Sequence, residues 1–101
     1  MLTKDGILET LRSHHEYLAS EFGVRRIGLF GSYAKGHQDE GSDIDLIADF
    51  DRVPGLKFVE LTEYLESLFG RSVDVLTQAG VQSIRNPRLA ARIRGSVVYA
   101  R

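Results

Sequence analysis

Residues 28–46 read GLFGSYAKGHQDEGSDIDL, and this stretch decides how the rest of the chain is interpreted. A short apolar run ends at Gly31 and Ser32, and the stretch closes with two aspartates, Asp43 and Asp45, that flank one isoleucine. Alternation of apolar and polar residues predicts a β-strand with one buried face. Side chains two positions apart on a strand share a face, with Cα atoms about 6.5–7 Å apart. The sequence therefore predicts that both carboxylates point the same way.

The glycine-serine pair is suited to bind an anion. Gly31 has no side chain, so phosphate oxygens can approach the backbone there, and amides at a helix start together with the Ser32 hydroxyl can hold them. The alternative is a tight turn between strand and helix with no ligand, which is the commoner meaning of an isolated Gly-Ser pair.

The two aspartates are suited to bind a divalent cation. Mg²⁺ prefers oxygen ligands and is usually held by a few carboxylates plus the phosphates of a substrate. Two such ions about 3.5–4 Å apart activate an attacking hydroxyl and stabilise a leaving pyrophosphate. Asp74 lies between Val73 and Val75, where an acid is costly unless it is paired or binds a cation, so it is a third candidate ligand. The alternatives are a solvated edge strand for the pair and a water-facing strand end for Asp74.

Other motifs fit the stretch less well. Gly31 and Gly36 have the spacing of the Walker A glycines, but the two residues beginning at His37 are not the required lysine and hydroxyl. An EF-hand starting at Asp43 fails because Ile47 stands at its third oxygen position. A glycosyltransferase with an Asp-x-Asp motif normally needs a larger domain and has no need of an upstream Gly-Ser pair.

The remainder of the chain predicts a small α/β domain over residues 1–101, with a mixed sheet flanked by helices. Apolar residues at helical spacing predict one amphipathic helix from Lys4 to Phe22 and another between the Pro54-Gly55 turn and Gly70. A third helix is expected from Asn86-Pro87 to Gly95, after a segment of weak helical character past Gly80. Strands are predicted over 24–30, 43–50, 72–77 and 97–99.

Composition limits the class of protein. The chain has 101 residues, 43% hydrophobic and 27% charged, as in ordinary soluble domains. It has no cysteine, which excludes disulfides, thiolate zinc sites and a cysteine nucleophile. No apolar run approaches the roughly 18 residues of a membrane span, so a cytoplasmic protein is expected. Thirteen bases and 14 acids nearly cancel, yet six acids fall within 39–51 and five arginines within 75–101. That asymmetry favours a localised site over general binding to nucleic acid or membranes.

The combined pattern resembles the nucleotidyltransferase superfamily that includes DNA polymerase β. Its signature is Gly-Ser, a spacer and Asp-x-Asp, which Gly31-Ser32, ten intervening residues and the pair beginning at Asp43 reproduce in order. GSYAKG followed by SDIDL is similar to the minimal nucleotidyltransferases (MNT), small domains commonly encoded beside a HEPN-domain protein. The resemblance covers most of the chain, since Asp74 in VDVLT falls at the third family carboxylate and VVYAR suits the last strand.

The resemblance implies roles for both halves of the motif. Gly31 and Ser32 would bind the triphosphate of ATP. Lys35 stands where the family often has arginine, and it keeps the charge without the bidentate fork.

The same resemblance implies that Asp43 and Asp45 would hold two Mg²⁺ ions. Asp74 would help bind the catalytic metal and would orient or deprotonate the acceptor hydroxyl.

The activity implied is transfer of AMP from ATP to a hydroxyl, expected to be a tyrosine of a partner HEPN toxin, so that the protein acts as an antitoxin. The acceptor is expected on another protein, because so small a domain lacks modules that hold a primer or tRNA. The alternative is a non-catalytic antitoxin that neutralises its partner toxin by direct complex formation.

The arginine-rich end is less informative. Arg88 and Arg92 share a helix face that Arg85 can approach, and a solvated face is the favoured interpretation. Contact with a triphosphate or with an acidic partner surface is the alternative. No aromatic residues alternate with these arginines, so direct binding of single-stranded nucleic acid is not expected.

Polar residues on either side of the acid pair have weaker claims. His37 lies between the Gly-Ser pair and the acids, and contact with a phosphate or the acceptor is the minority interpretation for it. Asp39 and Glu40 are expected to face solvent. Asp49 and Asp51 are expected to lie beyond reach of the metals.

Overall fold

A mixed β-sheet lies at the centre of the chain. The structure is a computed structural model that describes all residues except 1, 37–42, 52–54, 78–79, 81–84 and 101. Within the described residues the strands lie in the order β3-β2-β1-β4, with β2 parallel to β3 and β1 antiparallel to both of its neighbours. The predicted α/β class with a mixed sheet is thus confirmed. The strands are β1 (Val24–Phe30), β2 (Ile44–Phe50), β3 (Val73–Thr77) and β4 (Val98–Tyr99).

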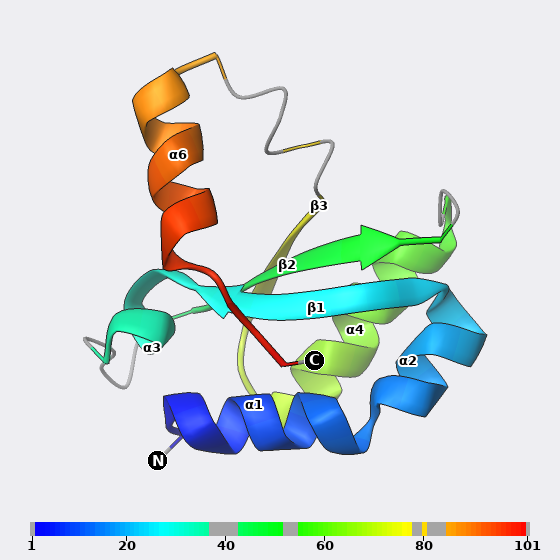
Figure 1. Ribbon diagram of the computed structural model, residues 1–101. Helices are drawn as coiled ribbons and strands as arrows, with labels where there is room; N and C mark the ends of the chain where they lie inside the picture. Colours follow the sequence, from blue (N-terminus) through cyan, green and yellow to red (C-terminus); the bar gives the residue numbers. More distant parts are fainter. Residues whose placement is uncertain (1, 37–42, 52–54, 78–79, 81–84, 101) are drawn as a thin grey trace.

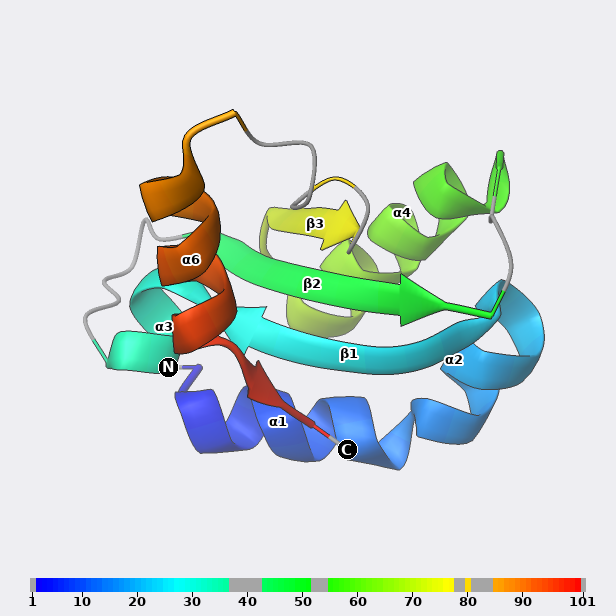
Figure 2. The same ribbon diagram turned by 45° about the horizontal axis from the view of Figure 1, so that its top comes forward.

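Helices cover both faces of the sheet (Figures 1 and 2). On one face lie α1 (Lys4–Ser13), α2 (His15–Phe22) and α4 (Lys57–Phe69), whose apolar sides form the larger core with the sheet. On the other face α6 (Pro87–Ser96) packs alone among the described helices. The short helix α3 (Gly31–Lys35) follows directly from the end of β1.

Alternation along β2 divides its side chains between these two faces. Ile44, Leu46 and Ala48 are fully buried in the larger core. Ile47 points the other way and packs in a smaller cluster with Ala90 of α6. Because side chains two apart share a face, the side that carries Asp45 is the side that α6 covers.

The N-terminal helix differs from the prediction, because α1 ends at Ser13 and α2 begins at His15. His14 between them has φ −103° and ψ 9°, outside helical geometry. Polar side chains near the junction compete for helix carbonyls: Thr10 Oγ1 donates to the Gly6 carbonyl at 2.9 Å, and His14 Nδ1 lies 2.8 Å from the Thr10 carbonyl. Such bonds back to the preceding turn bend helices, so one predicted helix becomes two.

The start of α6 is as predicted, but its end is not. The Asn86 side chain accepts hydrogen bonds from the amides of Arg88 and Leu89 at 3.0 and 3.3 Å, which caps the helix. The helix passes through Gly95 and ends at Ser96, whose hydroxyl bonds back into the last turn. Glycine is permitted as a stop but does not enforce one.

Three strands begin one residue later than expected: β4 starts at Val98, and the ladder between β2 and β3 starts at the pair Ile44 and Val73. Asp43 therefore precedes β2. The predicted Pro54 turn and the segment just past Gly80 fall largely outside the described residues. No helix in the described part of the chain has the length and apolar character needed to cross a bilayer.

Candidate active site

Strand register brings the glycine-serine turn and the third acid of the signature together around Asp45. On β2, Asp45 is paired with Phe30 at the end of β1 and with Asp74 on β3. Gly31 follows Phe30 directly, so the glycine-serine turn and the third acid flank the same residue from opposite sides. The structure therefore places Asp74 beside Asp45, although 28 residues lie between them in the chain.

Asp45 is in direct contact with the glycine-serine turn. A Cβ atom placed on Gly31 would overlap Asp45 Oδ2 and would lie 3.1 Å from Asp45 Cγ. Gly31 also has φ +74°, a conformation that side chains rarely adopt. Two independent requirements therefore demand glycine at position 31: the backbone turn into α3 and the space for the Asp45 carboxylate.

The acids at this end of the sheet repel one another. Partial burial raises the pKa of Asp45, and the neighbouring charges of Asp74 and then Asp43 raise its pKa further. A bound cation would relieve this repulsion, and a donor set made only of carboxylate oxygens suits a hard ion such as Mg²⁺. Among the described side chains, however, no group of three or more histidines, aspartates or glutamates is assembled as a metal site.

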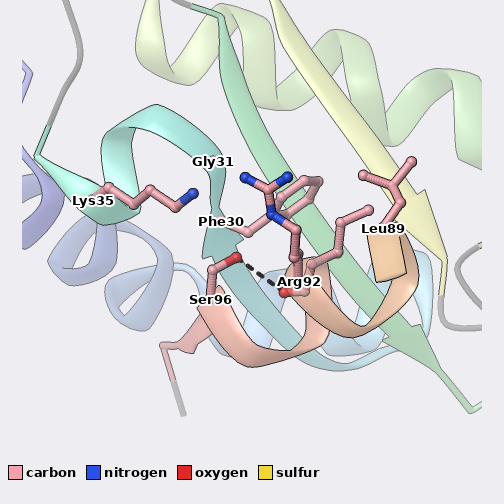
Figure 3. Close-up of a pocket in the computed structure, with 7 residues that line it drawn as sticks. Phe30, Gly31, Lys35, Leu89, Arg92 and Ser96 are labelled. Atoms are coloured by element: carbon pink, nitrogen blue, oxygen red, sulfur yellow. Dashed lines mark hydrogen bonds between the residues drawn. The ribbon is translucent and has the colours of Figure 1, made fainter. Parts of the chain in front are cut away.

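A cavity of about 300 Å³ opens next to Gly31, between α3 and α6 (Figure 3). The side chains of Lys35 and Arg92 reach toward each other across it, and their charged ends face the same space. The other lining side chains are apolar apart from Ser96. The residues that line the cavity are Phe30, Gly31, Lys35, Leu89, Arg92, Ile93 and Ser96.

The predicted nucleotide-binding residues occupy different places around this cavity. Gly31 and Lys35 line it, at the two ends of α3. Ser32 is half-buried in the first turn of α3 and is not among the lining residues. Phe30, at the N-cap of α3, offers no side-chain hydrogen bond to the helix amides.

The three arginines considered in the sequence differ in what they border. A solvated face was the favoured interpretation of the arginines, and Arg85 and Arg88 are exposed as expected. Arg92 is also exposed, but it lines the cavity beside Gly31. Helical spacing counted from the Asn86 cap predicts on which side of α6 Arg92 lies. Only the packing of α6 on the sheet determines that this side borders the cavity.

Glu66 on α4 was not singled out by the sequence. Its Oε2 accepts a hydrogen bond from the backbone amide of Val73 at 3.1 Å. Val73 is the first residue of β3 and precedes Asp74, so this bond fixes the start of the strand that carries the third acid. No pattern in the sequence signals a contact between these two residues.

The acids at the far end of β2 belong to a separate cluster. Asp49 Oδ2 lies 3.8 Å from the Nε atoms of both Arg25 and Arg26, and Asp51 Oδ1 lies 3.2 Å from Arg25 Nε. This confirms that Asp49 and Asp51 lie apart from the acid pair. The loop that contains His37 is outside the described residues.

Comparison with known proteins agrees with this geometry. The family model described as nucleotidyltransferase domain matches residues 11–99. The protein adenylyltransferase MntA of Thermococcus cleftensis is 43% identical over 100 residues, covering 98% of this chain and 97% of that protein. A solved structure of a candidate minimal nucleotidyltransferase is 33% identical, with a TM-score of 0.67 over 90% of this chain and 93% of the other.

A more distant match shares the fold. It is the MNT antitoxin in complex with the tri-AMPylated HEPN toxin of Shewanella oneidensis, with 18% identity and a TM-score of 0.60 over 93% of this chain and 71% of the other. The family match over most of the chain shows that this protein belongs to the nucleotidyltransferase domain family, and the approach of Asp45 to Gly31 agrees with it.

Proposed function

We propose that this protein is a Mg²⁺-dependent adenylyltransferase that transfers AMP from ATP to a tyrosine hydroxyl of a partner HEPN toxin, and thereby acts as an antitoxin in the cytoplasm. The observation that carries the proposal is the contact between Gly31 and Asp45, because it joins the turn proposed to bind phosphate to an acid proposed to bind metal. The relative named as a protein adenylyltransferase, which matches almost the full length of this chain, supports protein as the acceptor.

The proposed nucleotide site is centred on α3. Gly31 lets the phosphates approach the backbone, Ser32 offers its hydroxyl, and Lys35 contributes positive charge. A lysine ammonium is a point charge with three donors, so it neutralises a phosphate without fixing its orientation.

The proposed metal site is centred on β2. Asp43 and Asp45 would hold Mg²⁺, with Asp74 completing the set from β3. Bound there, the metal supplies Lewis-acid stabilisation of the negative charge that develops on the reacting phosphate. Because Mg²⁺ is usually held by a few carboxylates together with substrate phosphates, metal and nucleotide are expected to bind together.

The chemistry is a single displacement. The acceptor hydroxyl oxygen forms a bond to the α-phosphorus, and the bond from that phosphorus to the bridging oxygen breaks. Pyrophosphate leaves with the bonding electron pair, and the hydroxyl proton passes to a carboxylate, for which Asp74 is the candidate. Catalysis here consists of positioning the reactants and neutralising charge.

A HEPN toxin as acceptor is supported by a solved structure of the same fold, in which an MNT antitoxin is bound to a tri-AMPylated HEPN toxin.

The test is transfer of label from α-³²P-ATP to a purified HEPN-domain toxin that forms a complex with this chain. We expect labelling by the wild-type protein, loss of labelling in Asp43→Asn and Asp45→Asn, and retention in Asp51→Asn, which removes an acid from the far end of β2. Full transfer by both signature variants would refute the catalytic role of these acids. Neutralisation of the toxin that survives loss of all three acids, in an intact complex, would instead support masking by direct binding.

A further inference from the structure

Lys35 and Arg92 form a pair of like charges that face one cavity. They come from different helices, α3 and α6, and their charged ends point into the same space beside Gly31 (Figure 3). Among the described residues neither side chain forms an ion pair with a carboxylate. Two cations that face one space repel each other, and an anion bound between them replaces this repulsion with attraction.

The remaining lining shows what kind of anion fits. The other side chains are apolar except for Ser96, whose hydroxyl already donates to the Ile93 carbonyl at 3.1 Å. The ligand group that meets this surface must therefore satisfy two cationic donors with its own oxygens. A phosphate group does so, because a guanidinium pairs with two of its oxygens in a fork while the ammonium binds a third.

The position of the cavity shows which phosphates these are. Asp45 contacts Gly31 at the first residue of α3, so a phosphate shared with an ion on Asp45 lies at that end of the helix. Lys35 is the last residue of α3, about 6 Å further along its axis. The phosphate chain can thus continue from the acids toward the two cations.

We infer that Arg92 is a phosphate-binding residue which, with Lys35, holds the terminal phosphates of the nucleoside triphosphate, so that α6 forms one wall of the nucleotide site. This inference rests on the proposed function. In the transfer reaction the pyrophosphate that leaves gains negative charge, and a guanidinium placed against it stabilises that charge.

The test compares ATP with AMP, because AMP lacks the phosphates that Arg92 is inferred to hold. Binding of each nucleotide in the presence of Mg²⁺ is measured by isothermal titration calorimetry on the full chain. For Arg92→Ala we expect ATP affinity to fall by about 10- to 100-fold, with AMP affinity changed by less than about 3-fold. Arg92→Lys should fall between wild type and Arg92→Ala.

Arg88→Ala is the matched control. Arg88 lies one turn earlier on α6 and is exposed, but it does not line the cavity. The substitution Arg88→Ala removes the same charge from the same helix. ATP affinity should therefore fall by no more than about 3-fold, through loss of long-range attraction between the protein and ATP. Circular dichroism melting of both variants shows whether α6 stays folded.

Three outcomes overturn the inference. Equal ATP affinity in Arg92→Ala and Arg88→Ala would overturn it while leaving the proposed function intact. A loss of AMP affinity in Arg92→Ala as large as the loss for ATP would do the same, since it would place the effect outside the terminal phosphates. Absence of ATP binding by the wild-type chain would overturn both the inference and the proposed function.

Discussion

The carboxylate of Asp45 occupies the space that a side chain on Gly31 would need. The two residues come from opposite halves of the sequence signature, and the pairing of Phe30 with Asp45 across β1 and β2 brings them into contact. Glycine at position 31 thus permits both the turn with positive φ that leads into α3 and the close approach of the Asp45 carboxylate. A substitution there should disturb the site even where the fold survives.

Gly31→Ala tests this contact directly. We expect it to lower the free energy of unfolding by about 2–4 kcal/mol, from the strained positive φ and from overlap with Asp45. Gly36→Ala is the control, because Gly36 has the same φ of +74° but open space where its Cβ would lie. It should cost only about 1–2 kcal/mol, as measured by urea unfolding.

The double variant Gly31→Ala with Asp45→Ala completes the thermodynamic cycle. If the carboxylate is responsible for the excess cost, removing it should return Gly31→Ala to the cost of Gly36→Ala. An unchanged excess in the double variant would mean that the contact with Asp45 does not explain it.

Asp45→Asn should stabilise the metal-free protein near neutral pH. The raised pKa of Asp45 means that the folded state holds its proton to higher pH than the unfolded state does, so stability falls as pH rises above about 4. After allowance for solvent screening of this half-exposed side chain, the gain is about 0.5 kcal/mol, or roughly 2–4 °C in Tm at pH 7. The difference should shrink as the pH falls, since both side chains are then neutral.

Asp49→Asn is the matched control on the same strand. Asp49 lies near Arg25 and Arg26, so its neutralisation removes attraction where neutralising Asp45 removes repulsion. Its Tm at pH 7 should stay level or fall slightly, as measured by calorimetry in the presence of EDTA. A Tm increase equal to that of Asp45→Asn would show that the effect is general charge reduction.

Glu66→Ala should lower the activity of the site, although Glu66 is not one of the proposed site residues. Loss of the hydrogen bond to the Val73 amide is expected to cost about 1 kcal/mol and to lower AMP transfer several-fold by loosening β3, which carries Asp74. Glu66→Gln should restore most of the transfer, because its amide oxygen still accepts the bond. Glu63→Ala removes an exposed acid from the same helix and should leave both measurements near wild type.

Gly28→Ala should loosen the C-terminal strand. A Cβ at Gly28 would lie 2.6 Å from Val97 Cγ1 and 3.0 Å from Tyr99 Cδ1, so β4 and the end of α6 must shift, at a cost of about 1–3 kcal/mol. Gly95→Ala is the counterpart in α6, where the added Cβ meets open space. Gly95→Ala should therefore raise the free energy of unfolding by about 0.5–1 kcal/mol. Thermal unfolding checks that Gly28→Ala lowers Tm and Gly95→Ala raises it.

Elements of the fold that depend on local signals were predictable. The strand over 24–30 has the predicted limits, and the Asn86 cap starts α6 as expected, because alternation and capping act over a few residues. The break at His14 was not predicted, since the apolar periodicity runs through it and only competing polar side chains interrupt the helix.

In the candidate site, too, the residues with local sequence signals were predictable and those with only long-range contacts were not. Gly31 and Asp45 could be singled out because their residue types and spacing carry the chemistry within one short stretch. Glu66 could not be singled out, and Arg92 was one of three arginines for which triphosphate contact was the alternative, because the contacts of both residues are with segments distant in the sequence. Helical spacing predicted an exposed face for Arg92, which the structure confirms, but it could not predict the cavity that this face borders.

The sequence by itself determined the class of fold, the family resemblance and the two halves of the signature, because periodicity and motif spacing are local properties of the chain. Only the tertiary structure decided that the Asp45 carboxylate fills the missing side chain of Gly31, that Asp74 lies beside Asp45, and that Arg92 faces Lys35. Strand register and helix docking set these relationships, and both depend on packing among residues far apart in the sequence.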